Sequence, residues 1–123
     1  MVDMATLNGR RYRSNAPGED PSPVYLVIDS QRRWIVDQAI YDGLFPDTDG
    51  IYSETFLEDI PRGPDIDDAV LGRIADDDPN VYLGIDGRRR LVPNIATRDR
   101  YHFRGDVGPS ARIATLIDGA PVP

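Results

Sequence analysis

The chain has no cysteine and a single histidine, and these two shortages exclude whole classes of site. Without cysteine there is no disulfide framework and no thiolate chemistry. Transition metals prefer histidine and cysteine ligands, so His102, which stands alone between Tyr101 and Phe103, is interpreted as a packed structural residue. We therefore predict no cofactor and no transition-metal site.

Positive charge is also scarce. The chain has 14 Lys and Arg against 21 Asp and Glu, which gives a net charge of -7. Nucleic acid is a poor partner for such a chain, because phosphate binding needs clustered positive charge. An anionic membrane surface is disfavoured for the same reason. The partners that we expect are a protein or a surface glycan, with an oligomeric assembly as a further alternative.

Long apolar runs are missing as well. No stretch approaches the length that spans a membrane, so no membrane insertion is predicted. Residues 1–5 lack the apolar core of a secretory signal, and arginines follow them. We expect a soluble protein that is either cytoplasmic or extracellular as part of a particle, and the sequence does not choose between these locations.

Turn-forming residues are abundant, with 11 Gly and 11 Pro in 123 residues. This composition favours short elements and many turns over long helices. The length fits a single domain over residues 1–123.

Two stretches of the chain match at a constant spacing. Residues 24–37 are VYLVIDSQRRWIVD and residues 81–94 are VYLGIDGRRRLVPN. The match continues to Phe45 and Phe103 if one residue is inserted in the second stretch. Chance similarity between two strands explains apolar alternation, but it does not explain a shared Asp and a shared Arg-Arg pair. We predict a duplicated unit, with repeat one at about residues 5–64 and repeat two at about residues 65–123.

Each copy is predicted to form a β-hairpin. Asp86-Gly87 is a strong signal for a type I′ turn, and Asp29-Ser30 is a weaker one. With two-residue loops, four cross-strand pairs are expected: Tyr25 with Trp34, Val24 with Ile35, Tyr82 with Leu91, and Val81 with Val92.

Short elements are expected around the hairpins. Asp37 and Asn94 are good N-caps, and a helix over residues 38–42 should end at Gly43. The other elements predicted are a strand at residues 50–52, a helix at residues 54–59 capped by Ser53, a strand at residues 69–74, and its first-copy counterpart near residues 6–9.

The expected fold class is α+β and β-rich, with two tandem pseudo-twofold repeats. Each repeat would hold a hairpin, an extra strand and short helices. Neither copy has enough apolar residues to bury a core alone, so the two copies are expected to pack together around one core.

The stretch Tyr82-Leu83-Gly84-Ile85-Asp86-Gly87-Arg88-Arg89-Arg90-Leu91-Val92-Pro93, with Ile60-Pro61-Arg62-Gly63-Pro64, resembles a bacterial tandem repeat. Repeats of this kind recur in surface or secreted bacterial proteins, often of unassigned function. The resemblance covers most of the chain from Val24 onward. It implies a non-catalytic module and assigns no functional residue.

The ligand-binding residues that we predict are aromatic and arginine side chains of the hairpins: Tyr25, Arg32, Arg33, Trp34 and Arg89. An exposed aromatic ring beside Arg and Asp can stack on a sugar and hydrogen-bond its hydroxyls. For Tyr25 and Trp34, the interpretation that we favour is nevertheless that they are core residues, because residues 24–28 are apolar on both faces of the strand.

Acidic clusters are the remaining candidates. Asp76, Asp77 and Asp78 are weak calcium candidates, but they lack the spacing of an EF-hand loop. Aspartate is also an ordinary turn residue, and turn formation is the interpretation that we favour.

The function predicted from these features is a non-catalytic binding module that recognises a surface ligand, with carbohydrate as the expected class. We expect no enzyme, because no nucleophile elbow and no phosphate-binding loop occur in the sequence. The alternative is a structural subunit of a larger assembly, such as a phage virion or an injection particle.

Overall fold

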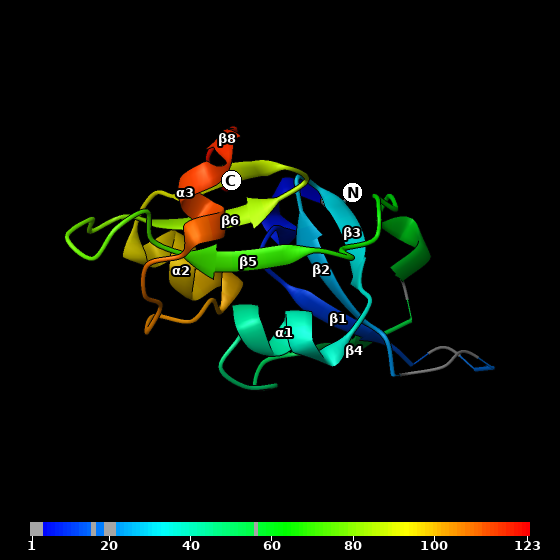
Figure 1. Cartoon of the computed structure of the whole chain (residues 1–123). Helices are drawn as coiled ribbons and strands as arrows, with labels where there is room; N and C mark the ends of the chain where they lie inside the picture. The colour runs from blue at the N-terminus through cyan, green and yellow to red at the C-terminus, as the bar shows by residue number, and fades with distance from the viewer. Residues whose placement is uncertain (1–3, 16, 19–21, 56) are drawn as a thin grey trace.

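The computed structural model describes residues 4–15, 17–18, 22–55 and 57–123, and these form two four-stranded sheets (Figure 1). The first sheet has the order β3-β2-β1-β4 and the second β5-β6-β7-β8. The strands are β1 (Arg11–Ser14), β2 (Val24–Ile28), β3 (Gln31–Ile35), β4 (Tyr52–Glu54), β5 (Ala69–Gly72), β6 (Val81–Ile85), β7 (Arg88–Val92) and β8 (Ile117–Asp118). The helices are α1 (Gln38–Leu44), α2 (Ile95–Tyr101) and α3 (Ala111–Thr115), with 3-10 turns η1 (Met4–Leu7) and η2 (Leu57–Asp59). The predicted β-rich α+β class is confirmed.

Both predicted hairpins form with the predicted register. Tyr25 lies opposite Trp34 in the β2–β3 pair, and Tyr82 lies opposite Leu91 in the β6–β7 pair. All four turn residues have positive φ, at 55° and 61° for Asp29 and Ser30 and at 56° and 76° for Asp86 and Gly87. Positive φ at both central positions is the requirement of a type I′ turn, so the weaker Asp-Ser signal is correct as well.

The predicted N-caps are also confirmed. The Asp37 side chain accepts a hydrogen bond from the Ile40 amide at the start of α1, and Asn94 accepts one from Thr97 at the start of α2. The prediction that α1 ends at Gly43 is wrong, because the helix continues through Leu44. The residue inserted after α2 is His102, which adopts a left-handed conformation at the C-cap.

Three of the predicted short elements are displaced. The strand expected at residues 50–52 is β4, and it occupies part of the segment expected to be helical, because β1 offers it a parallel edge. The helix expected at residues 54–59 shrinks to η2. The strand expected near residues 6–9 is β1, which begins only at Arg11, and residues 4–7 form a 3-10 turn instead.

The two sheets share one pattern of neighbours. The strand before each hairpin pairs antiparallel with its first strand, as β1 with β2 and β5 with β6. A later segment pairs parallel with the hairpin's second strand, as Arg62 with Arg32 and as β8 with β7. Another segment pairs parallel with the opening strand, as β4 with β1 and as Pro109 with Arg73. The duplication stays a prediction, which these matched pairings support.

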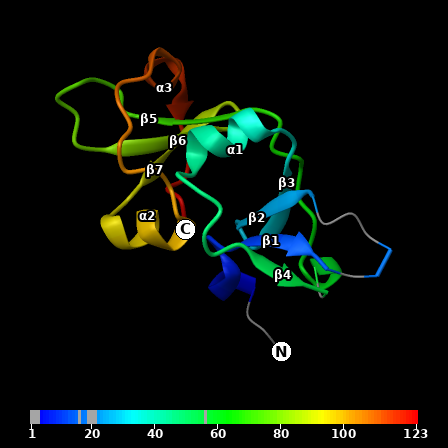
Figure 2. The same cartoon turned by 90° about the horizontal axis from the view of Figure 1, so that it is seen from below.

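The larger of two apolar clusters among the described residues draws side chains from both halves of the chain, while a smaller one lies within the first half, so the expectation of one shared core is only partly correct. The smaller cluster is formed by Leu7, Tyr12, Val27, Leu57 and Ile60. The buried members of the larger cluster from the first half are Leu26, Ile28, Ile35, Tyr41, Leu44 and Phe45, and those from the second are Ile66, Leu71, Leu83, Ile85, Val92, Tyr101, Phe103 and Val122. Helix α1 crosses from the first sheet to pack against β5 of the second (Figure 2). The rings of Phe45 and Phe103 stack with centroids 5.7 Å apart, so two positions matched in the sequence meet each other in the core.

The second arginine of each pair binds the turn of the other hairpin. Arg33 donates to both carboxylate oxygens of Asp86 at 2.8 and 2.7 Å. Arg90 donates to both oxygens of Asp29 at 2.6 and 2.8 Å. Because the four residues are matched in the sequence, the two contacts are reciprocal, as in an interface between two copies of one unit. These bidentate pairs hold the hairpins against each other.

Candidate functional site

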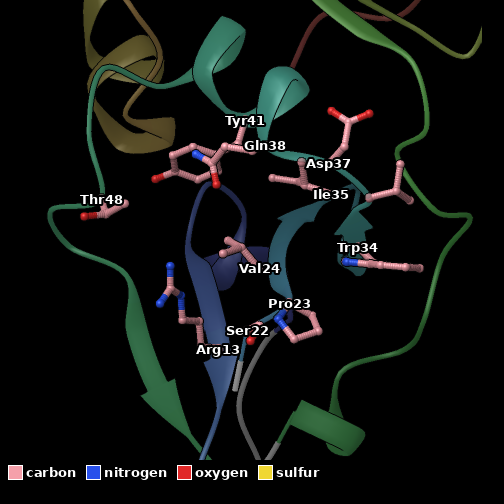
Figure 3. Close-up of a pocket in the computed structure, with 11 residues that line it drawn as sticks. Arg13, Ser22, Pro23, Val24, Trp34, Ile35, Asp37, Gln38, Tyr41 and Thr48 are labelled. Atoms are coloured by element: carbon pink, nitrogen blue, oxygen red, sulfur yellow. The ribbon is translucent and has the colours of Figure 1, made fainter. Parts of the chain in front are cut away.

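A pocket of about 290 Å³ opens beside the first sheet, where the end of β3 leads into α1 (Figure 3). Its lining combines an apolar wall with polar side chains at the edge. The residues are Arg13, Ser22, Pro23, Val24, Trp34, Ile35, Val36, Asp37, Gln38, Tyr41 and Thr48. Its volume lies just below the usual range for small-molecule pockets, roughly 300–1,000 Å³.

Strand alternation explains which side chains face the pocket. Val24 and Ile35 lie opposite each other and both point to the face that packs in the shared core. Trp34 points to the other face of the sheet. Figure 3 shows its ring directed away from Arg13 and Thr48, so Trp34 contributes to the rim and not to the centre.

Arg13 supplies the positive charge of the pocket. It comes from β1, where Tyr12 is fully buried on the opposite face and Ser53 of β4 is its parallel neighbour. The Nε atom of Arg13 is buried and has no hydrogen-bond partner among the described residues. Within the same residues, no carboxylate forms an ion pair with its guanidinium. Figure 3 shows the guanidinium extending toward Thr48 and Tyr41.

The aromatic wall of the pocket is Tyr41, and its hydroxyl is already engaged. It accepts a hydrogen bond from Arg11 Nη1 at 2.7 Å and donates to the Asp47 carbonyl at 2.6 Å. Arg11 is itself buried, binds the Asp49 carbonyl through Nη2, and lies over the Phe45 ring. These contacts fix the loop that carries Thr48, so this wall of the pocket is formed before any ligand arrives.

Two polar side chains at the edge of the pocket beside α1 already form hydrogen bonds with that helix. Asp37 Oδ1 accepts the Ile40 amide at 2.8 Å, and Gln38 Nε2 donates to Asp42 Oδ1 at 2.8 Å. Gln38 keeps its amide oxygen for other partners. Figure 3 shows the Asp37 carboxylate at the end of the pocket opposite Arg13 and pointing away from it.

The loop of Thr48 is also tied to the second half of the chain. His102 Nε2 lies 2.6 Å from Asp47 Oδ1. The hydrogen bond from His102 lowers the pKa of the Asp47 carboxyl, and a bond from the Asp49 amide lowers it further. The lone histidine therefore has a structural contact, as the sequence suggested, although the residue that it contacts was not foreseen.

Of the five residues predicted as ligand contacts, Tyr25, Arg32 and Trp34 lie together on one face of the first hairpin, whereas Arg33 lies on its other face and Arg89 on the second hairpin. Tyr25 and Trp34 are both half-buried, so neither is a fully buried core residue. Tyr25 is covered by the guanidinium groups of Arg32 and Arg62, which lie 5.2 and 5.7 Å from its ring centroid. Arg32 Nε also donates to the Ile60 carbonyl at 3.1 Å.

The other two predicted arginines are occupied by contacts within the protein. Arg33 is buried against Asp86 and donates through Nε to the Pro64 carbonyl at 2.7 Å. Arg89 binds Asp118 at 2.8 Å and the Ile113 carbonyl at 3.1 Å, and its guanidinium lies over Tyr82. Of the five, only Trp34 lines the pocket.

Sequence reasoning missed the residues at the centre of the pocket. Arg13, Gln38 and Thr48 come from three different segments, and none of them belongs to the matched stretches at residues 24–37 and 81–94. The apolar residues of the hairpin, such as Val24 and Ile35, indicate the apolar wall of the pocket, but no local sequence pattern indicates its polar groups.

The acidic turn does not form a metal site in the part of the chain that the structure describes. Asp78 Oδ1 accepts the Asn80 amide at 2.9 Å, which is the hydrogen bond of an ordinary turn. Within the described ranges, no three side chains of the metal-binding types come together.

A second hollow lies across the two halves, lined by Gly9, Arg10, Arg11, Asp49, Gly50, Tyr52, Asp99, Arg100 and His102. Its arginines have partners: Arg10 lies over the Tyr52 ring, and Arg100 binds the Pro123 carbonyl. Acidic side chains also line it. This hollow therefore offers less unpaired charge than the Arg13 pocket.

Comparison of the chain with models of known protein families, with curated proteins and with solved structures finds no match. Among the described residues, no helix has the length and apolar character needed to span a bilayer.

Proposed function

We propose that the protein is a non-catalytic binding module that takes a small carbohydrate into the Arg13 pocket. The observation that carries this proposal is the combination of an apolar wall with an unpaired guanidinium, an amide and a hydroxyl at one preformed opening. Small-ligand sites are commonly built in this way, with a few polar groups placed around an apolar surface.

The chemistry of the rim favours binding over catalysis. Among the residues that the structure describes, the lining has one carboxylate, Asp37, and that carboxylate caps α1. His102 binds Asp47 outside the pocket, and the Tyr41 hydroxyl is held between two partners. Hydrolysis or acyl transfer needs a nucleophile or an acid–base pair that converges on one point. These lining groups do not provide such a pair.

The same rim suits a sugar. The C–H face of a pyranose can pack on Val24 and Ile35, while its hydroxyls bond to Gln38, Thr48 and Arg13. The expected affinity is low. At roughly 0.3 kcal/mol per non-hydrogen atom, a ligand of about 12 atoms gains about 4 kcal/mol, which corresponds to a Kd of about 1 mM.

Saturation-transfer NMR with a panel of monosaccharides tests the proposal. Thr48 lies at the opening, so Thr48→Trp should cover the pocket and abolish the transfer signal. The matched control is Thr115→Trp, which changes an exposed threonine on α3 in the other half of the chain. If no sugar gives a signal at about 10 mM, roughly ten times the expected Kd, or if both variants behave alike, the proposal is wrong.

A further inference from the structure

We infer that the ligand of this pocket is a sugar acid, and that its carboxylate pairs with Arg13. This inference rests on the proposed function and names the class of carbohydrate. Most arginines of this protein that are partly or fully buried donate a hydrogen bond to an acceptor within the chain.

Several arginines of the chain form ion pairs with carboxylates. Arg33 and Arg90 each hold a carboxylate with two parallel hydrogen bonds, and Arg89 holds Asp118. Even Arg112, on an exposed helix, pairs with Asp68 at 2.8 Å. In a chain with 21 acidic and 14 basic residues, acidic partners are plentiful.

Arg13 departs from this pattern at the pocket. It is half-buried, its Nε has no partner, and it forms no ion pair within the described residues. A guanidinium presents its donors as a planar fork that matches a carboxylate. The ligand group that best fits this position is therefore a planar monoanion.

The remaining charge of the pocket favours one negative charge over two. Arg13 is the one cationic side chain among the described lining residues, and Asp37 stands at the opposite end. A phosphate ester carries about -1.5 to -2 charges and is usually held by several cationic or amide donors. A carboxylate can be neutralised by Arg13 alone, while the sugar hydroxyls extend toward Gln38 and Thr48.

Arg73 provides an internal comparison. It pairs parallel with Pro109 as Arg13 pairs with Ser53, so the two arginines occupy matching places in the two sheets. Its Nε is also buried without a partner among the described residues. An unpaired Nε is therefore a feature of this position, and what distinguishes Arg13 is that its guanidinium borders the pocket, which Arg73 does not.

Calorimetric titration with three matched sugars tests the inference: D-glucose, D-glucuronate and D-glucose 6-phosphate. The wild-type chain should bind D-glucuronate about tenfold or more tightly than D-glucose, because hydrogen bonds to charged groups are the stronger ones. Arg13→Gln should bring the two affinities together. Arg13→Lys should keep part of the difference, since it keeps the charge and loses the fork. Arg73→Gln should keep all of it.

Each outcome has a distinct meaning. Equal binding of D-glucose and D-glucuronate to the wild type overturns the sugar-acid inference and leaves the proposed function intact. Absence of binding by all three sugars overturns the proposed function and this inference with it. Tighter binding of D-glucose 6-phosphate overturns the carboxylate assignment. A thermal melt of each variant identifies loss of folding, and the Arg13→Lys comparison then decides the question.

Discussion

Replacing Asp86 by Asn should lower the free energy of unfolding by the contribution of its ion pair with Arg33. Arg33 has a side chain only 4% exposed, and Asp86 is its bidentate partner at the other hairpin turn. Asn is tolerated at positive φ, so the turn conformation at Asp86 is kept while the charge is removed.

The size of the loss follows from charge and exposure. Two unit charges about 4 Å apart interact by roughly 4 kcal/mol at the effective dielectric of a protein surface. The Asp86 side chain is 58% exposed, so solvent screening reduces this to about 2 kcal/mol. For a domain of this length, that corresponds to a decrease in Tm of roughly 6–10 °C.

The pH dependence has a definite sign. The hydrogen bond from Arg33 lowers the pKa of Asp86 below its ordinary value of 3.8. A carboxylate whose native pKa is lowered contributes stability above the unfolded value and loses that contribution as the pH falls through the native value. The difference between the wild type and Asp86→Asn should therefore be constant near neutral pH and shrink below about pH 4.

Urea denaturation followed by circular dichroism measures this loss. The matched control is Asp65→Asn, which breaks an Arg62–Asp65 pair whose side chains are 48% and 42% exposed, and it should cost less than about 0.5 kcal/mol. Asp29→Asn, which breaks the reciprocal pair, should resemble Asp86→Asn. If Asp86→Asn costs no more than Asp65→Asn, the reasoning that the exchanged arginines hold the halves together is refuted.

Three further changes test other parts of the account. Asn94→Ala should lower the free energy of unfolding by about 1 kcal/mol, because it removes the acceptor for the Thr97 amide; an unchanged urea midpoint would contradict this. Gly84→Ala should lower the free energy of unfolding by about 1–3 kcal/mol in the same assay, since the new Cβ would lie 2.9 Å from both Leu116 and Val70; a variant as stable as the wild type would contradict this. Tyr101→Phe should stabilise the protein by about 1 kcal/mol, because the Tyr101 hydroxyl is buried without a hydrogen-bond partner among the described residues, and the same burial raises the pKa of the phenol; a lower Tm than that of the wild type would contradict this.

The parts of the fold that the sequence predicts are those encoded locally. The Asp-Gly turn fixes a two-residue loop, and that loop fixes the register of Tyr82 against Leu91. Asn94 caps α2 through a residue three positions away. Each of these signals lies within a few residues of the structure that it determines.

The parts that were missed depend on contacts between distant segments. The strand expected at residues 50–52 forms instead at residues 52–54 because β1 offers it a parallel edge, and no pattern in these residues indicates that pairing. Arg33 was predicted to contact a ligand, yet the opposite hairpin covers it. The repeated Asp and Arg did carry a signal for this exchange, since two matched halves that face each other pair such residues reciprocally.

The candidate site was predicted only in its outline. The sequence pointed to the first hairpin, where Trp34 and Val24 do border the pocket. Its positive charge comes from Arg13, which lies on β1, before the first matched stretch in the chain. Strand alternation turned the Trp34 ring to the other face, so the expected stacking platform is replaced by the Tyr41 and Ile35 wall.

An amide NMR titration of the intact chain with D-glucuronate tests the binding pocket most directly. The account predicts saturable shifts at the amides of Arg13, Val36, Gln38 and Thr48, with the second sheet unaffected. Shifts centred on the hollow of Arg10, Tyr52 and Arg100, or no saturable shifts at all, would contradict it.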